Sequence, residues 1–349
     1  MAILIGHGFD DGTLGDFANS SDNFAPVVTT ARARTGTHSV GLPTDANGAG
    51  SGIAATVPSP LTTGWVYCAW YISAFDGSGQ IRTPIIWRDN ASVQMYVGLR
   101  GSDRKFAIYN AVGTQVSGLS TFTAPLDGWF QMAAKITVAN AGGSVEVRFN
   151  GGATDLTFSG DTQNTANAFY TNVRFMHLGS RSNATNTWLD DVVLQDATGS
   201  APENDWIGDV EASPIIVTAD HASSGYVVGG TTPAATLYQS VNEGVPNEFV
   251  TTIDSAVAGD YASFEGSDMA AGPGTIFAYI VQYRAAKTTA GARKMQGRLD
   301  LGGTVALGPA VDLATSMRTY QSVFHRDPNS NIWTPANVNL ARLGVRTNT

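Results

Sequence analysis

The sequence has 349 residues, a formal net charge of −9 and a charged fraction of only 14%. The negative balance argues against a nucleic-acid partner, and the apolar residues occur in short runs that argue against a membrane-spanning helix. We therefore expect neither nucleic acid nor a membrane as a partner. Such a surface of amides and hydroxyls suits large assemblies or neutral glycans, and equally a plain β-sandwich.

The composition also predicts the structural class. The chain has 39 glycines and only four lysines, together with many Ser, Thr, Asn and Asp residues. These residues disfavour long helices and favour frequent turns, so we expect an all-β protein with helix only in short pieces. Two domains are the default expectation at this length.

The opening MAILIGHGFDDGT predicts a first strand that leads to Asp10 and Asp11. Its apolar run is short and lacks the basic residues of a secretory signal, so we expect no signal peptide. Further along, Cys68 alternates with Val66 and Trp70 in a strand pattern. As the only cysteine it cannot form an intrachain disulfide, and we interpret it as a small buried hydrophobe.

Several segments in the first part of the chain have the alternation or the composition of β-strands. Three aromatic residues among them, Trp87, Tyr96 and Tyr109, would form a sugar platform if exposed, and are otherwise ordinary sheet-face residues. The predicted strands are Trp65 to Ile72, Ile85 to Trp87, Val93 to Leu99, Lys105 to Tyr109, Phe130 to Val138, Ser144 to Phe149, Val173 to Leu178 and Trp188 to Gln195.

The segment from Phe130 to Phe149 carries the clearest pattern. Apolar and polar residues alternate on both sides of Gly142-Gly143, and Asn150-Gly151 follows as a second turn. These features predict a β-meander, and the number of strands around it suffices for two packed sheets. We therefore predict a concanavalin-A-like (laminin-G-like) jelly roll over residues 1–197.

Paired acids mark both ends of this jelly roll. On the last strand Asp190 shares a face with the core residues Trp188 and Val192, so a buried Asp190 needs partners. If the terminal strands pair, Asp10 and Asp11 would meet Asp190 and Asp191 in an oxygen-rich site for a structural Ca²⁺. Alternatively, these carboxylates accept backbone N–H bonds in turns or lie in solvent.

No catalytic constellation stands out, and we predict a protein that is not an enzyme. The five histidines have no zinc-site spacing, and no G-x-S-x-G motif supports an esterase. A retaining glycosidase needs two carboxylates about 5 Å apart. The strand around Glu146 carries that acid alone, with Arg148 where a second acid would stand.

A small-residue segment beginning at Ala197 divides the chain, and we predict a linker over residues 198–213. A second β-sandwich, suited to assembly or attachment, is expected over residues 214–349. Its predicted strands are Ile215 to Val217, Thr236 to Val241, Glu248 to Ile253, Tyr261 to Phe264, Thr275 to Arg284, Ala292 to Leu301, Arg318 to Phe324 and Val338 to Val345.

Charge is unevenly distributed along this second part. Between Ser182 and Tyr283 there are fourteen acids and no Lys or Arg, whereas from Arg284 onward nine basic residues face three acids. If these halves lie on opposite faces, copies of the chain could meet head to tail. Alternatively, acidic and basic strands interleave and satisfy each other locally.

Motifs along nearly the whole chain carry a resemblance. They are GFDDGTLGDF, GWFQMAAKITV, GSVEVRFNG, SGDT, RFMHLGS and WLDDVVLQD in the first part, and ENDWIGDV, NEFVTTIDSAVAGDYASFEG, AKTTAGARKMQGRLDLGGT and DPNSNIWTPANVNLARLGV in the second. The chain resembles the laminin-G-like, concanavalin-A-like lectin/glucanase domains of tailed-bacteriophage structural proteins. The resemblance implies a virion component, such as a capsid decoration, neck, tail or fibre-associated protein, and brings no catalytic residue set with it.

Three functions follow as expectations. The first is a non-enzymatic virion structural protein that assembles in the host cytoplasm, with other virion proteins and copies of itself as partners. The second is an adhesin that binds a host surface glycan. The third is a polysaccharide-cleaving enzyme, which would need a carboxylate pair brought together from distant loops.

Overall fold

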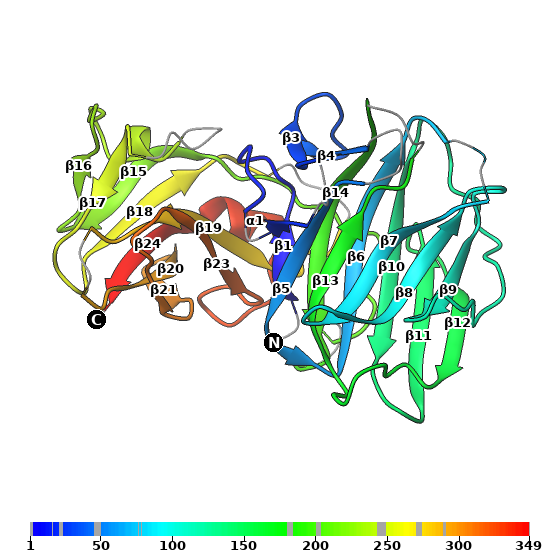
Figure 1. Ribbon diagram of the computed structural model, residues 1–349. Coiled ribbons are helices and arrows are strands. Elements are labelled where there is room, and N and C mark those ends of the chain that lie inside the picture. Colours follow the sequence, from blue (N-terminus) through cyan, green and yellow to red (C-terminus); the bar gives the residue numbers. More distant parts are fainter. Residues whose placement is uncertain are drawn as a thin grey trace. The chain divides into compact units, whose positions relative to one another are not determined.

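The computed structural model describes residues 3–15, 17–20, 24–44, 50–75, 77, 79–179, 184–199, 204–242, 249–269, 274–288 and 291–348 (Figure 1). By their internal contacts the residues form two compact units. Unit 1 comprises residues 1–9 and 16–212, and unit 2 comprises residues 10–15 and 213–349. The division falls between Ala212 and Ser213, near the end of the predicted linker.

Unit 1 contains two antiparallel sheets (Figure 1). The larger has the strand order β12-β11-β10-β6-β14-β4-β3, with β1 also paired to β14, and the smaller has the order β2-β5-β13-β7-β8-β9. The larger sheet consists of β1 (Ile3–His7), β3 (Val27–Thr29), β4 (Ser39–Thr44), β6 (Thr63–Ile72), β10 (Trp129–Thr137), β11 (Gly143–Phe149), β12 (Thr154–Gly160) and β14 (Ala184–Asp196). The smaller consists of β2 (Phe17–Asn19), β5 (Gly52–Leu61), β7 (Ile81–Asp89), β8 (Ser92–Arg100), β9 (Phe106–Asn110) and β13 (Tyr170–Met176).

Alternate side chains of both sheets form the core of unit 1. Phe130 of β10 and Phe106 of β9 join the two sheets, with ring centroids 5.9 Å apart. Trp70 on β6 and Trp87 on β7 are completely buried. Cys68 is buried as well, and its sulfur accepts a hydrogen bond from Trp70 Nε1 at 3.1 Å. The interpretation of Cys68 as a buried hydrophobe is thus confirmed, and burial raises the pKa of its thiol.

Residues 204–212 belong to unit 1, because they are fastened to the large sheet and to the segment before β4. Trp206 meets Tyr67 of β6 edge-on, and the guanidinium of Arg148 on β11 lies 4.1 Å from the centroid of the Trp206 ring. Arg34 Nη1 donates a hydrogen bond of 2.8 Å to the backbone carbonyl of Val210. This half of the predicted linker is therefore a docked segment.

Unit 2 is also built of antiparallel strands. Its main sheet has the order β15-β18-β24-β20-β21, with β22 also paired to β20, and two-stranded sheets β16-β17 and β19-β23 accompany it. The strands are β15 (Val217–Ser224), β16 (Val227–Gly229), β17 (Thr252–Asp254), β18 (Tyr261–Gly266), β19 (Tyr279–Ala285), β20 (Lys294–Leu301), β21 (Thr304–Leu307), β22 (Val311–Asp312), β23 (Arg318–Phe324) and β24 (Arg342–Asn348). A 3-10 helix η1 (Tyr238–Ser240) and a short helix α1 (Pro335–Leu340) complete the described elements.

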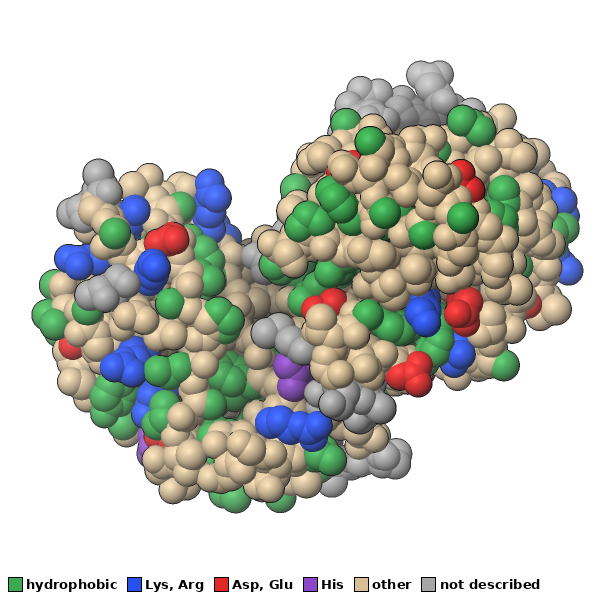
Figure 2. All heavy atoms as spheres, turned by 90° about the horizontal axis from the view of Figure 1, so that it is seen from below, with side chains coloured by type: hydrophobic (Ala, Val, Ile, Leu, Met, Phe, Trp, Pro, Cys, Tyr) green, Lys and Arg blue, Asp and Glu red, His purple; other side chains and the backbone are tan. Residues whose placement is uncertain are grey.

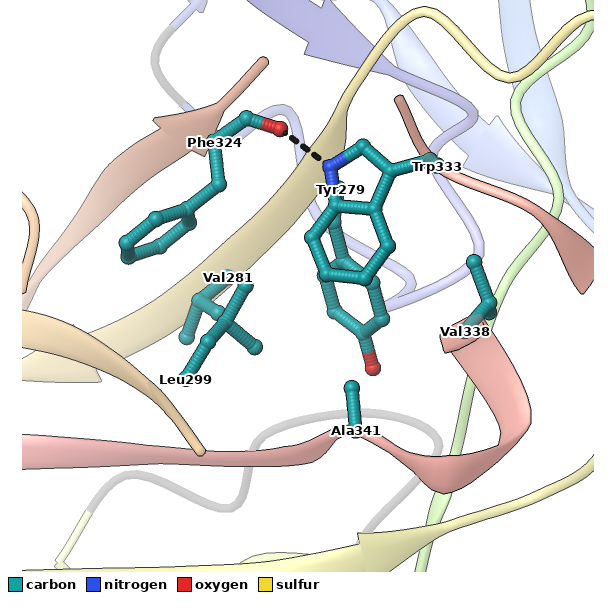
Figure 3. Packing of buried hydrophobic residues seen from close by; sticks show 7 residues of the cluster. All are labelled: Tyr279, Val281, Leu299, Phe324, Trp333, Val338 and Ala341. Carbon is teal, nitrogen blue, oxygen red and sulfur yellow. Dashed lines mark hydrogen bonds between the residues drawn. The ribbon is translucent and has the colours of Figure 1, made fainter. Parts of the chain in front are cut away.

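One core cluster of unit 2 lies between the β19-β23 pair, β20 and α1 (Figure 3), and a second is formed by Tyr226, Ala262, Phe264 and Val345. Trp333 is almost fully buried beside Tyr279, and its Nε1 donates a hydrogen bond of 2.8 Å to the carbonyl of Phe324. Val338 of α1 and Ala341 pack into the same cluster. The short helix is thereby held against the sheet by its apolar side.

The predicted fold class is confirmed: a jelly-roll sandwich precedes a second, smaller β-sandwich, and the described helices are short. In the part of the chain that the structure describes, no helix is long and apolar enough to cross a membrane.

Several predicted strands of unit 2 are wrong in detail. Of Glu248 to Ile253 only Thr252 and Ile253 lie in a strand, β17, and Glu248 lies outside the described residues. The segment Thr236 to Val241 contains η1, and the segment Val338 to Val345 begins inside α1. The helix starts there because the Thr334 hydroxyl caps it by accepting the backbone N–H of Asn337 at 3.2 Å, and Pro335 occupies its first turn.

Candidate functional site

The three aromatic residues that the sequence offers as a sugar platform lie on opposite faces of the small sheet. Trp87 points into the core and is completely buried, as the alternative of an ordinary sheet-face residue expects. Tyr96 and Tyr109 lie directly opposite each other on the outer face, because they have the other parity of β8 and β9.

The two tyrosines form a parallel stack. Their ring centroids are 5.1 Å apart and their planes differ by 5°. Gly98 makes room for them, since a Cβ at that position would lie 2.5 Å from Cε2 of Tyr109. Tyr109 is buried and Tyr96 is half-buried, so Tyr96 is the member of the stack that presents apolar surface to solvent.

Two arginines flank this stack on the same outer face. Across the β7-β13 pair, Arg88 lies opposite Asn172 and Arg174 lies opposite Ile86, so the two arginines are diagonal neighbours. Ile86 in turn lies opposite Tyr96 on β8. One row of the sheet therefore runs from Arg174 through Ile86 to the tyrosines, with Arg88 beside it.

Neither arginine has an acidic partner among the described residues. Arg88 donates from Nη2 to the carbonyl of Ala91, and its Nε is buried without a partner. Arg174 makes no hydrogen bond or ion pair with the residues that the structure describes. Burial, and then the positive charge of Arg174, lowers the pKa of Arg88 from its usual value.

We refer to Ile86, Arg88, Tyr96, Tyr109 and Arg174 as the arginine–tyrosine face. Its two guanidinium groups repel each other, and no carboxylate of a described residue pairs with either of them. A planar anion, such as a carboxylate or a sulfate, is the natural partner for such groups because it accepts paired N–H bonds. The tyrosine stack beside them suits the C–H face of a ring.

The predicted calcium ligands Asp190 and Asp191 are both completely buried at a bulge in β14. Asp190 Oδ2 accepts the backbone N–H of Arg34 at 2.8 Å, and its Oδ1 accepts that of Asp191 at 2.8 Å. Asp191 pairs with the guanidinium of Arg34 at 3.0 Å and accepts the hydroxyl of Thr35 at 2.6 Å. Burial, and then the charge of Asp191, raises the pKa of Asp190 to about 8.

The other two predicted ligands, Asp10 and Asp11, group with unit 2. Asp11 accepts the backbone N–H of Thr13 at 2.9 Å and the side-chain amide of Gln282 at 2.6 Å. Among the described residues, no group of three or more His, Cys, Asp or Glu side chains could hold a metal ion. The structure brings Asp190 and Asp191 together, and the calcium site remains a prediction.

Glu146 lies on β11 directly opposite Lys135, and its carboxylate accepts the Thr154 hydroxyl at 3.4 Å. The guanidinium of Arg148, on the same strand, lies over the Trp206 ring. Of the histidines, His177 lies 2.6 Å from Asn186 Oδ1 and is buried, whereas His221 is exposed.

Acidic and basic strands interleave in the main sheet of unit 2. The strand β18, which carries Glu265, pairs directly with β24, which carries Arg342, and the two side chains form an ion pair of 3.2 Å. Arg298 pairs with Asp300 on its own strand at 3.0 Å. This is the local compensation that the second interpretation of the charge pattern expects. The visible surface as a whole is mostly neutral (Figure 2).

Sequence reasoning missed Arg88 and Arg174. They lie in the strand patterns around Trp87 and Val173, at the polar positions of the alternation, which mark them as outward-facing. The alternation does not predict that β7 pairs with β13, which brings together residues 86 positions apart in the chain.

No protein-family model and no curated protein matches the chain. Among solved structures, "Cellulose induced protein, Cip1" is 18% identical, covers 54% of this chain and 96% of its own, and has a TM-score of 0.42. The endo-β-1,4-glucuronan lyase from the fungus Trichoderma reesei is 12% identical over 53% of this chain and 93% of its own, with a TM-score of 0.43. A tandem CBM22 domain of Paenibacillus barcinonensis Xyn10C is 11% identical over 99% of this chain and 89% of its own, with a TM-score of 0.30.

Proposed function

We propose that unit 1 is a non-enzymatic glycan-binding module, and that it holds an acidic polysaccharide on the arginine–tyrosine face. The observation that carries the proposal is the pair Arg88 and Arg174, two neighbouring guanidinium groups without an acidic partner among the described residues. A bound carboxylate or sulfate would neutralise both groups.

The neighbouring side chains support a sugar ring as the rest of the ligand. Tyr96 is half-buried and stacked on Tyr109, so it is held in one orientation and loses little entropy on binding. Ile86 lies between the stack and Arg174 and extends the apolar strip. A ring that packs on Tyr96 would therefore have an arginine within reach of its acidic substituent.

We assign no catalytic role because the acids Glu146 and Asp103 are engaged by other side chains. Glu146 lies opposite Lys135 and accepts a hydrogen bond from the Thr154 hydroxyl. Among the described residues it forms no hydrogen-bonded pair with a second carboxyl group. Asp103, the acid nearest in sequence to the tyrosine stack, forms an ion pair with Arg100. We therefore assign binding to this face and no bond cleavage.

Affinity gel electrophoresis with polygalacturonate and alginate in the gel tests this proposal. The wild-type chain is expected to be retarded by at least one of them, and the R88A/R174A variant to lose about tenfold in affinity because charge-assisted bonds are lost. R100A is the matched control: it removes one positive charge that Asp103 already compensates, and its retardation should change little. Unretarded wild-type protein, or an R88A/R174A variant that is retarded equally, would contradict the proposal.

The sequence resemblance supports a separate proposal about the particle to which the chain belongs. We propose that the chain is a virion component of a tailed bacteriophage, where unit 1 would present its glycan-binding face and unit 2 would contact other virion proteins. Immunogold labelling of intact particles tests this: label on the head, neck, tail or fibres supports it. Protein that remains free in the lysate, with unlabelled particles, would overturn the virion assignment and leave the glycan-binding proposal intact.

A further inference from the structure

Unit 2 contains a pocket of about 570 Å³, a size typical of small-molecule sites. It lies where the turn between β20 and β21, the loop after β23, helix α1 and the start of β24 come together. The residues that line it are His221, Asp300, Leu301, Gly302, Gly303, Asp327, Asn329, Asn331, Asn337, Leu340 and Arg342.

The loop that forms one wall is held in place by Asp327, which is buried. Its Oδ1 accepts the backbone N–H groups of Asn329 at 2.9 Å and Asn331 at 2.8 Å. Its Oδ2 accepts the side-chain amide of Asn337, on α1, at 2.8 Å. Since α1 is itself anchored in the core through Val338 (Figure 3), this wall is preformed.

The charged groups of the pocket already have partners. Asp300 accepts from Arg298 at 3.0 Å, Arg342 pairs with Glu265 at 3.2 Å, and Asp327 is surrounded by amide donors. No positive charge in this lining is left without an acid, so an anion would find no free cation there. A neutral ligand is favoured.

Several polar groups of the lining remain available to such a ligand. The side chains of Asn329 and His221 are exposed and make no hydrogen bond with the described residues. These groups offer donors and acceptors at several points of the wall. Beside them Leu340 is 61% exposed and provides an apolar surface.

We infer that this pocket binds a neutral, hydroxyl-rich ligand with an apolar C–H face, of the size of one or two sugar rings. Hydroxyl groups both donate and accept hydrogen bonds, and so match the mixed amide, imidazole and guanidinium groups of the wall. The C–H face would pack on Leu340. This site goes beyond the proposed acidic-glycan site of unit 1 and shares no residue with it.

Saturation-transfer difference NMR tests the inference on the full chain. The probes are methyl α-glucoside, methyl α-mannoside, methyl β-galactoside and N-acetylglucosamine, each at millimolar concentration. We expect saturation transfer to at least one probe in the wild-type protein, and a loss of about fivefold or more in H221A and in N329A. Both side chains are exposed, so these variants should keep the near-ultraviolet circular dichroism of the wild type.

S330A is the matched control, because Ser330 lies on the same loop and does not line the pocket. It should leave the transfer unchanged, as should R88A/R174A, which tests the other site. Failure of R88A/R174A to alter polygalacturonate retardation would overturn the proposal for unit 1 alone. Absence of transfer to all four probes, or equal transfer in H221A and N329A, would overturn the inference for unit 2 alone.

Discussion

The arginine–tyrosine face of unit 1 and the pocket of unit 2 both contain arginine, yet they favour opposite ligands. On the face, Arg88 and Arg174 have no acidic partner among the described residues. In the pocket, Arg342 is neutralised by Glu265, and the neighbouring Arg298 by Asp300. The partner of a guanidinium, and not its presence alone, therefore decides whether a site attracts an anion.

The largest expected effect comes from supplying the missing partner on the face. In R174E, the new carboxylate would lie beside Arg88 and neutralise it, and would repel an acidic glycan as well. We expect polygalacturonate affinity to fall by about 100-fold, or about 2.7 kcal/mol. Affinity electrophoresis measures it, and a fall no greater than that of R174A would show that charge compensation is not the decisive factor.

The buried carboxyl groups of Asp190 and Asp191 test whether neighbouring groups of like charge also disfavour each other when both are acids. Burial, and then Asp191, raises the pKa of Asp190 to about 8, whereas the unfolded chain releases this proton near pH 4. The folded state thus binds more protons between these values, and stability falls as the pH rises through that window. We expect a loss of about 2 kcal/mol in the free energy of unfolding between pH 6 and pH 9.

Urea unfolding at both pH values measures this loss. D190N has a similar shape and cannot titrate, so although it loses one of the two oxygens that accept backbone N–H groups, its stability should change less over the same range. An equal pH dependence in D190N would mean that other groups cause the slope. D312N, at a residue on β22 that is exposed, is the control and should behave as the wild type.

Removing acids from the pocket of unit 2 should have the opposite effect to adding one on the arginine–tyrosine face. E265Q removes the acid that neutralises Arg342 in the pocket lining, and D300N removes an acid from the lining itself, so together they should make the pocket attract an anion. In the R88A/R174A background, we expect the added pair of substitutions to restore about tenfold in polygalacturonate affinity, or about 1.4 kcal/mol. No gain would indicate that the released arginines turn to other partners.

The smallest expected effect is a difference in how salt affects ligand binding at the two sites. Exposed charge interactions weaken as the Debye length falls from about 10 Å at 0.1 M to about 3 Å at 1 M salt. Raising NaCl from 0.1 to 0.5 M should therefore lower polygalacturonate binding several-fold and leave saturation transfer from the neutral glycosides unchanged. Equal salt dependence of both would contradict the assignment of their ligand charges.

The sequence predicts the fold better than it predicts these sites. Alternation around Met132 and Val147 correctly places a hairpin, because its turn and register are local. The sequence leaves open whether Trp87 is a sugar platform or a sheet-face residue, because period-2 alternation separates two faces and does not say which is buried. The faces are identified by the tertiary pairing, in which Trp87 lies opposite Met95 and Val173 and all three are buried.

The candidate sites depend on still longer-range pairing. Arg88 and Arg174 meet only because β13 inserts between β5 and β7. In unit 2, Asp327 is a recognisable turn residue from its DPNSN sequence, yet its bond to Asn337 requires that Thr334 start a helix. Local signals predict each part, and the contact between the parts is set by packing.

The docked segment 204–212 determines where unit 1 ends as a piece of protein. A fragment that stops at residue 197 would lack Trp206, which covers Tyr67, and would lack the Val210 carbonyl that binds Arg34. A fragment that stops at Ala212 keeps both, together with the Ala212 backbone N–H that Asp191 accepts at 2.8 Å. A fragment of unit 1 should therefore extend to Ala212 if it is to keep the contacts that the docked segment makes.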